Sequence, residues 1–167
     1  MITVVLKILD TALIVCRKDR KMGLDQTAKL QSRTVDWKKY YSQDRKESEK
    51  EQAGVFQWRK HARLQVFMAR EYAKQNPKED TNEHSSMNGL GFNGDDHKVV
   101  ITKDVLKRLE EAIKNGYYDY FASDGFFWGQ QFQEESMKEY KKMDLQFVKW
   151  CKKALEKGEV IEYSCSW

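Results

Sequence analysis

The stretch KVVITKDVLKRLEEAIKNG, residues 98–116, decides the fold class because it predicts a strand that leads directly into a helix. Residues 98–101 form a short apolar run, which favours a buried strand. Thr102 is a good N-cap for a helix over residues 103–115, and Gly116 is typical of the residue that ends one. The apolar residues of this helix follow the spacing of one helical face; they are Val105, Leu106, Leu109, Ala112 and Ile113.

Two other segments also have helical periodicity. Residues 56–74 combine a broad apolar side with a basic one, and residues 134–157 carry an apolar stripe that Gly158 ends. Residues 160–167 alternate apolar and polar side chains and predict a final strand, while residues 26–36 lean towards a strand. We therefore expect an α+β fold, with about three helices packed on a small antiparallel or mixed sheet.

The expected domain organisation is an N-terminal extension over residues 1–21 and a single domain over residues 22–167. A chain of 167 residues is within the usual size of one domain. Residues 42–52 are nearly all charged or polar, which indicates a solvated helix or a connection. Residues 76–97 contain Pro77 and several Gly, Ser, Asn and Asp residues, and they predict a long loop.

The composition excludes several classes of protein. With 40% hydrophobic and 13% aromatic residues, the chain is too apolar to be disordered. Its three cysteines lack the spacing of a zinc site and are odd in number, which favours a reducing compartment without a disulfide framework. No run approaches the roughly 20 apolar residues that span a bilayer, and no signal-peptide pattern opens the chain. We expect a cytoplasmic protein without membrane contact.

The net charge of +4 is unevenly distributed along the chain. Residues 1–75 carry 17 Lys or Arg against 9 Asp or Glu, and the remainder carries 13 against 17. A basic half attracts nucleotides, nucleic acid or an acidic protein surface, although such residues also commonly only solvate helix faces. Nucleic acid is the weaker expectation, because the acidic second half predicts no extended basic stripe.

The first candidate site lies in the predicted basic helix and consists of Trp58, Arg59, Lys60, His61 and Arg63. Guanidinium groups bind phosphate with two parallel hydrogen bonds, and aromatic faces stack on bases. The first turn of a helix also offers free backbone N–H groups to anions. These residues predict a nucleotide or phosphate site; the alternative is that Trp58 belongs to the core and the charged residues face water.

The second candidate site is a glycine-bracketed aromatic segment, made up of Gly125, Phe126, Phe127, Trp128 and Gly129. Glycine allows a ligand to approach the backbone closely, so the segment predicts the wall of a pocket for a base or another planar group. The alternative is an apolar plug between two helices, which is the more common use of aromatic side chains.

The third candidate site is the acidic segment that contains Asp95, Asp96 and His97. Carboxylates and a histidine can hold a divalent cation, but the spacing of a calcium-binding loop is missing, so a simple turn explains the segment better. The chain also lacks the GxSxG, P-loop, HExxH and GxGxxG signatures. We therefore assign no metal, cofactor or catalytic residue, and the sequence leans against an enzyme.

Five short motifs occur in a fixed order along the chain: MGLD at 22–25, WRKH at 58–61, FN at 92–93, GFFWG at 125–129 and YSCSW at 163–167. Together they resemble a family of small bacteriophage and bacterial proteins that begin with MGLD, carry a WRK helix and a GFFFG segment, and end in a YSSW-like strand. The resemblance covers residues 22–167 except 31–54 and 76–91. Trp128 stands where the family has a third Phe, and Cys165 where it has a Ser.

The resemblance implies a phage context and a ligand site rather than a particular reaction. The leading expectation is a small phage accessory protein of the anti-defence type, which binds a phosphate-bearing, nucleotide-like ligand in the cytoplasm of the host cell. The second is a protein–protein module that inhibits a host enzyme, and the third is a metal-dependent phosphoester hydrolase that uses Asp95, Asp96 and His97. The expected partner is thus a nucleotide-like small molecule or a host protein, and an oligomer is compatible with either.

Overall fold

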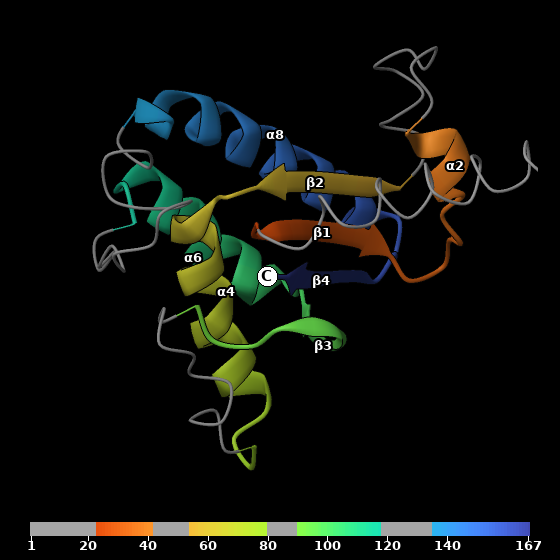
Figure 1. The fold of residues 1–167 in the computed structure, drawn as a ribbon, viewed down its shortest axis with the longest axis horizontal. Helices are drawn as coiled ribbons and strands as arrows, with labels where there is room; N and C mark the ends of the chain where they lie inside the picture. The colour runs from red at the N-terminus through yellow and green to blue at the C-terminus, as the bar shows by residue number, and fades with distance from the viewer. Residues whose placement is uncertain (1–22, 42–53, 80–89, 118–134) are drawn as a thin grey trace, which may run out of the picture.

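The computed structural model describes residues 23–41, 54–79, 90–117 and 135–167, and it confirms the α+β class. Four strands form one antiparallel sheet in the spatial order β2–β1–β4–β3 (Figure 1). The strands are β1 (Asp25–Leu30), β2 (Val55–Arg59), β3 (Gly94–Val100) and β4 (Ile161–Ser166). The helices are the one-turn α2 (Trp37–Tyr40) and the longer α4 (Ala62–Gln75), α6 (Lys103–Lys114) and α8 (Met137–Glu156).

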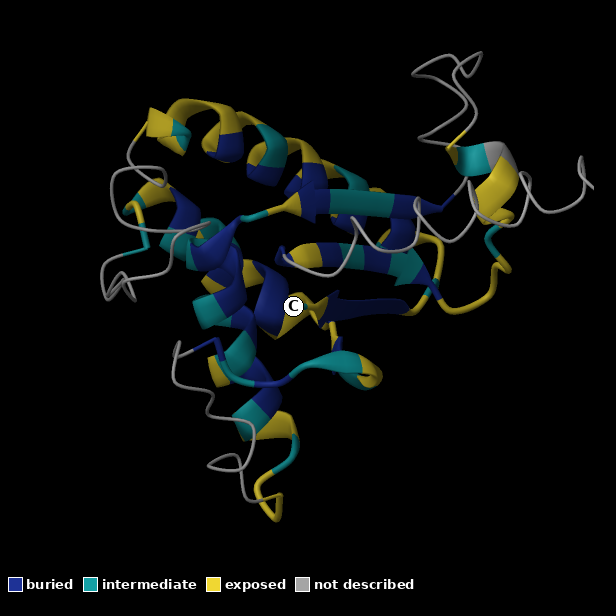
Figure 2. Cartoon of the chain, in the orientation of Figure 1, coloured by how far each residue is buried: buried dark blue, intermediate teal, exposed yellow. Residues whose placement is uncertain are grey.

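The sheet has one apolar face and one polar face, because side chains alternate along each strand. In β1, Ala28 is fully buried and lies opposite both Phe56 of β2 and Tyr163 of β4. Thr27 and Lys29, on the other face of β1, are only partly buried. The apolar face packs against the three long helices and forms the core, which appears as the dark interior in Figure 2.

Among the described residues after 101, the elements form where the sequence predicts them. Thr102 caps α6, since its hydroxyl accepts a hydrogen bond from the backbone N–H of Val105 at 3.2 Å. Gly116, just after the helix, has φ 67°, a left-handed conformation that glycine adopts without strain. The predictions of a long helix within residues 134–157 and of a strand within residues 160–167 are confirmed by α8 and β4.

The prediction of one helix over residues 56–74 is wrong at its start, where the chain forms β2 and a tight turn. Lys60 has φ 60°, which ends the strand and turns the backbone into α4, and its N–H donates to the carbonyl of Leu24 at 2.6 Å. Val55, Trp58 and Ala62 have the spacing of one helical face, which favours a helix, whereas Phe56 and Trp58, two residues apart, share a face only in a strand.

Two other predictions need correction at their boundaries. The loop expected over residues 76–97 ends earlier, because β3 begins at Gly94 and pairs with β4 there. The strand expected within residues 26–36 stops at Leu30, after which Ser32 and Thr34 are exposed. The expected extension at 1–21, the connection at 42–52 and the aromatic segment at 125–129 lie outside the described residues.

Candidate functional site

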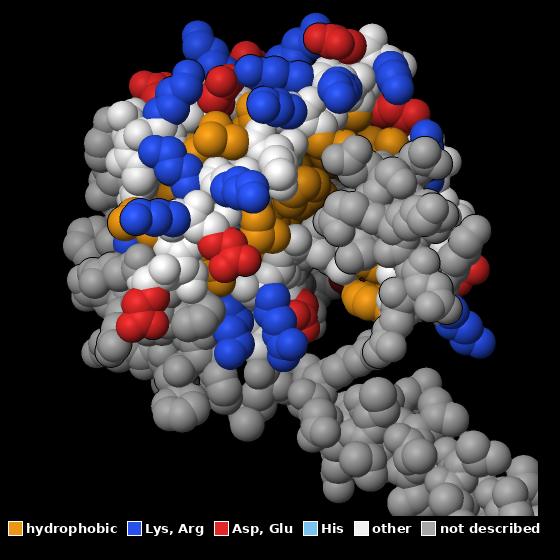
Figure 3. All heavy atoms as spheres, turned by 90° about the horizontal axis from the view of Figure 1, so that it is seen from above, with side chains coloured by type: hydrophobic (Ala, Val, Ile, Leu, Met, Phe, Trp, Pro, Cys, Tyr) orange, Lys and Arg blue, Asp and Glu red, His pale blue; other side chains and the backbone are white. Residues whose placement is uncertain are grey.

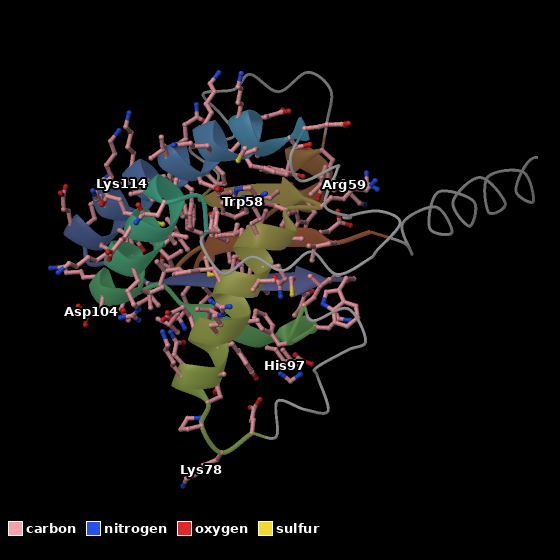
Figure 4. All side chains as sticks on the ribbon, turned by 90° about the vertical axis from the view of Figure 1, so that its left-hand side faces the viewer. Trp58, Arg59, Lys78, His97, Asp104 and Lys114 are labelled. Atoms are coloured by element: carbon pink, nitrogen blue, oxygen red, sulfur yellow. The ribbon has the colours of Figure 1, made fainter. Side chains whose placement is uncertain are left out.

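A cleft of about 300 Å³ opens between α4 and α6, the two helices nearest the viewer in Figure 4. One wall comes from α4 and the other from α6 and the residue Tyr117 that follows its end. The α4 wall consists of Arg63, Val66, Phe67, Arg70, Glu71 and Lys74, and the opposite wall of Arg108, Glu111, Ala112 and Tyr117.

Helical spacing explains how α4 contributes a row of cations to the cleft. Arg63, Arg70 and Lys74 are separated by seven and four residues, so they lie along one side of the helix. Phe67 lies between them on the same side and contributes apolar surface. At 1.5 Å of rise per residue, the row from Arg63 to Lys74 extends for about 16 Å.

An ion cluster centred on one buried carboxylate joins the two walls of the cleft. The Glu71 side chain is 2% exposed and accepts hydrogen bonds from Arg108 Nε at 3.0 Å, from Arg108 Nη2 at 2.6 Å and from Lys74 Nζ at 2.8 Å. Burial alone would raise the pKa of Glu71, but the hydrogen bonds and charges of Arg108 and Lys74 outweigh it and lower this pKa. Glu71 is thus a carboxylate that fixes Arg108 in place across the cleft.

The net charge of the side chains that line the cleft is positive. Four cationic side chains line it, against the two carboxylates of Glu71 and Glu111. Val66, Phe67 and Ala112 provide apolar surface among these charges. Such a surface suits a ligand that carries both an anionic group and a planar or apolar group.

Tyr117 connects the cleft to a polar network in the core. Its hydroxyl donates to Asp144 Oδ2 at 2.8 Å, and its backbone has φ 56°, a strained value for a residue with a side chain. Burial, and then the negative charge of Asp144, raise the pKa of Tyr117 well above its usual range of about 10. The phenol therefore remains a neutral hydrogen-bond donor at physiological pH.

Asp144 of α8 is the centre of this network. It is 1% exposed and accepts hydrogen bonds from Trp58 Nε1 at 3.0 Å and from His61 Nε2 at 2.8 Å, in addition to that from Tyr117. The backbone N–H of Leu64 points to His61 Nδ1 at 3.5 Å, so the ring N–H lies on Nε2 and is donated to Asp144. The carboxylate thus has three donors in a fully buried setting.

Other groups hold His61 equally firmly. Its ring stacks on Tyr140 with centroids 4.0 Å apart. Gln26 Oε1 accepts from the His61 backbone N–H at 2.9 Å, and Gln26 Nε2 donates to the His61 carbonyl at 3.0 Å. Every polar group of His61 is committed within the core, so the residue is structural.

The structure separates the residues of the first candidate site instead of bringing them together. Trp58 and His61 are buried, so neither is available to stack on a ligand or to contact one. Arg59 is 65% exposed on its side chain, lies 3.6 Å from Asp25 and points away from the cleft (Figure 4). Lys60 forms the turn, and Arg63 alone of these residues lines the cleft.

Sequence reasoning missed three cations of the cleft. The spacing of Arg70 and Lys74 from Arg63 follows one helical face, so this row was detectable in the sequence. Arg108 comes from another helix, and only the tertiary fold, which places α6 opposite α4, brings it to the cleft. The second candidate site, Gly125 to Gly129, lies outside the described residues, and its relation to the cleft stays a prediction.

The third candidate site lies apart from the cleft. Asp95 and Asp96 are exposed in β3, and His97 Nδ1 lies 2.9 Å from the hydroxyl of Tyr72. In Figure 4, His97 is on the opposite side of α4 from α6. Among the described residues, no group of three or more His, Cys, Asp or Glu side chains could hold a metal ion.

Comparisons of the chain with family models, with curated proteins and with solved structures return no match. The family resemblance drawn from the sequence motifs therefore stays a prediction. Within the part of the chain that the structure describes, no helix has the length and apolar character to cross a membrane.

Proposed function

We propose that the protein binds a phosphate-bearing, nucleotide-like ligand in the cleft between α4 and α6. The observation that carries this proposal is the row of Arg63, Arg70 and Lys74 beside the apolar side chain of Phe67 in one cleft. A cleft of about 300 Å³ is also at the lower end of the usual size of small-molecule sites.

The lining residues would bind two different parts of the ligand, its phosphate and its base. Arginine guanidinium groups bind phosphate oxygens through paired, charge-assisted hydrogen bonds. Phe67 and Ala112 offer an apolar surface for a base, and the Glu111 carboxylate can accept hydrogen bonds from an amino group. The Glu71–Arg108 pair holds the far wall in position before the ligand arrives, which reduces the ordering cost of binding.

The phage resemblance suggests what such binding would achieve. A small protein that binds a nucleotide-like signal in the host cytoplasm would lower its free concentration and weaken the response that depends on it. This accessory, anti-defence role is part of the same proposal, and it needs no catalytic group in the cleft.

The test is isothermal titration calorimetry with a panel of mononucleotides, cyclic nucleotides and cyclic dinucleotides, preceded by native mass spectrometry. We expect at least one of them to bind, and Arg70→Gln to weaken binding about tenfold or more, since a charge-assisted hydrogen bond contributes about 1.5–3 kcal/mol. Arg59→Gln is the matched control, because it removes the same charge on another side of the molecule. Absence of binding by the whole panel at 1 mM, or equal losses in the two variants, would refute the proposal.

A second candidate function is a protein–protein module that inhibits a host enzyme. Trp37 is 41% exposed and Tyr41 is 56% exposed, and their rings stack with centroids 5.9 Å apart. Tyr and Trp are the residues most often found at energetic centres of interfaces. If this candidate holds, Trp37→Ala and Tyr41→Ala should abolish a complex recovered from host lysate, whereas Arg70→Gln should leave it intact.

A further inference from the structure

The outer face of α8 carries a concentrated positive charge that the proposed function does not use. Figure 2 shows this side of the helix exposed, and Figure 3 looks onto it from above, where Lys and Arg side chains stand out. Its exposed lysines are Lys138, Lys141, Lys142, Lys149, Lys152 and Lys153.

Helical geometry places these lysines in one stripe. Successive residues of an α-helix are offset by about 100°, so all six fall within an arc of roughly 120°. The buried residues of α8, such as Asp144, Phe147 and Cys151, lie on the opposite side. Glu156 is the one acid of α8 within the arc, at the C-terminal end of the helix. Residues 76–167 together carry more acidic than basic residues, so their net charge does not reveal the lysine stripe on α8.

Most of the stripe is not neutralised by the protein itself. Lys152 pairs with Glu110 of α6 at 2.8 Å. Within the described part of the chain, the other five lysines make no ion pair with an acid. The acids near the stripe are fewer than its lysines, so repulsion among the lysines remains, and a polyanion laid along the helix would relieve it.

The length and chemistry of the stripe fit a regular line of phosphates. Lys138 and Lys153 are about 22 Å apart along the helix axis, and phosphates on one strand of a duplex advance by about 3.4 Å per nucleotide. Lysine is a compact point charge, and α8 contains no arginine to pair with base edges. Such a surface contacts the phosphate backbone without reading sequence.

The packing of α8 argues against a lipid surface as the partner. A helix that binds in the membrane interface inserts its apolar side, but here Phe147, Val148 and Cys151 are buried in the protein core. We propose that the outer face of α8 binds the phosphate backbone of duplex nucleic acid, independently of the cleft between α4 and α6.

The experiment is fluorescence anisotropy of a labelled 20-base-pair DNA duplex of arbitrary sequence, titrated with the full chain at several NaCl concentrations between 50 and 200 mM. We expect log Kd to rise with log salt with a slope of up to about 5, since each neutralised phosphate contributes about 0.9. The triple variant Lys141→Gln, Lys142→Gln, Lys149→Gln should lower this slope by about 3 and weaken binding tenfold or more at 50 mM NaCl.

The matched control is Lys38→Gln, Lys78→Gln, Lys103→Gln, which removes the same charge from exposed positions outside α8. It should keep the slope of the unaltered chain, and both triple variants should keep its melting temperature because all six side chains are exposed. Three results would overturn the proposal: no binding at 50 mM NaCl, equal losses in the two variants, or displacement of the duplex by anionic lipid vesicles of equal phosphate concentration.

Discussion

The polar network around Asp144 and the cleft between α4 and α6 use similar residues in opposite ways. Around Asp144, each donor finds a partner within the protein, and Trp58, His61 and Tyr117 all point to one carboxylate. In the cleft, cations line a surface open to solvent, and the two walls are joined by the Glu71 cluster and by the hydrogen bond from Arg63 Nη1 to the Gly116 carbonyl at 3.1 Å. The first region is an internal anion site already occupied by a side chain, whereas the second leaves room for an external anion.

This contrast shows why neighbouring residues of one motif take different roles. Trp58 and His61 turn inward at the end of β2, while Arg63, two residues further on, faces the cleft from α4. The reversal occurs at Lys60, whose left-handed backbone changes the direction of the chain. A cluster of aromatic and basic residues in the sequence is therefore not evidence of a single site.

The largest effect should come from the centre of the buried network. Asp144→Ala leaves three buried donors without their acceptor, so we expect the free energy of unfolding to fall by about 3–5 kcal/mol. Urea denaturation measures this change. Leu145→Ala is the neighbouring control, since Leu145 is exposed and its loss should be small. A change below about 1 kcal/mol in Asp144→Ala would show that the network is not stabilising.

An intermediate effect on stability should come from Glu71, which pairs with Arg108 across the cleft. Its pKa is lower in the folded protein than the ordinary value of 4.5, so its contribution is fully present above that value and is lost as the pH falls through the folded pKa. Glu71→Gln should cost about 2 kcal/mol at pH 7 and clearly less at pH 3, as measured by urea denaturation at both pH values.

The control for Glu71 is Glu111→Gln, which removes an exposed carboxylate from the same cleft. It should change stability little at either pH, because exposed charges contribute little. If Glu71→Gln cost the same at pH 3 as at pH 7, the Arg108–Glu71–Lys74 cluster would not depend on the charge of this carboxylate.

The smallest effect should come from Arg59, which belongs to neither region. Its side chain is 65% exposed and lies 3.6 Å from an Asp25 side chain that is itself 52% exposed. Arg59→Gln should therefore lower the free energy of unfolding by less than about 1 kcal/mol and leave the affinity for nucleotides unchanged. Thermal melting checks the expected change in stability, and the calorimetric titration checks the affinity. A marked loss of affinity in Arg59→Gln would show that the ligand binds near β2 instead of in the cleft.

The parts of the fold that the sequence predicted are those with local signals. Thr102 and Gly116 mark the ends of α6, and the spacing of apolar residues identifies α8. The strand β2 was not predicted, since Val55 and Trp58 also have the spacing of a helical face that continues into α4, and Lys60 takes a conformation usually signalled by glycine or asparagine. The strand order depends on pairing between distant segments, for which no local pattern exists.

The candidate site was predictable to a smaller extent. Arg63 was identified for its charge, and the continuation to Arg70 and Lys74 follows from helical spacing. The contribution of Arg108 depends on where the fold places α6 relative to α4, and the burial of His61 depends on Asp144, which lies 83 residues away along the chain. Tertiary packing decides which charged residues face a ligand, and a single sequence does not contain that information explicitly.

The position of β4 has a consequence for how the protein forms during synthesis. It is the last described strand along the chain, yet it pairs with both β1 and β3 and so lies inside the sheet. During synthesis, β1 and β3 therefore lack their shared partner strand until residues 161–166 have left the ribosome. Until then their apolar residues, including Ala28 and Val99, lack their final neighbours, so the sheet relies on non-local contacts that form late.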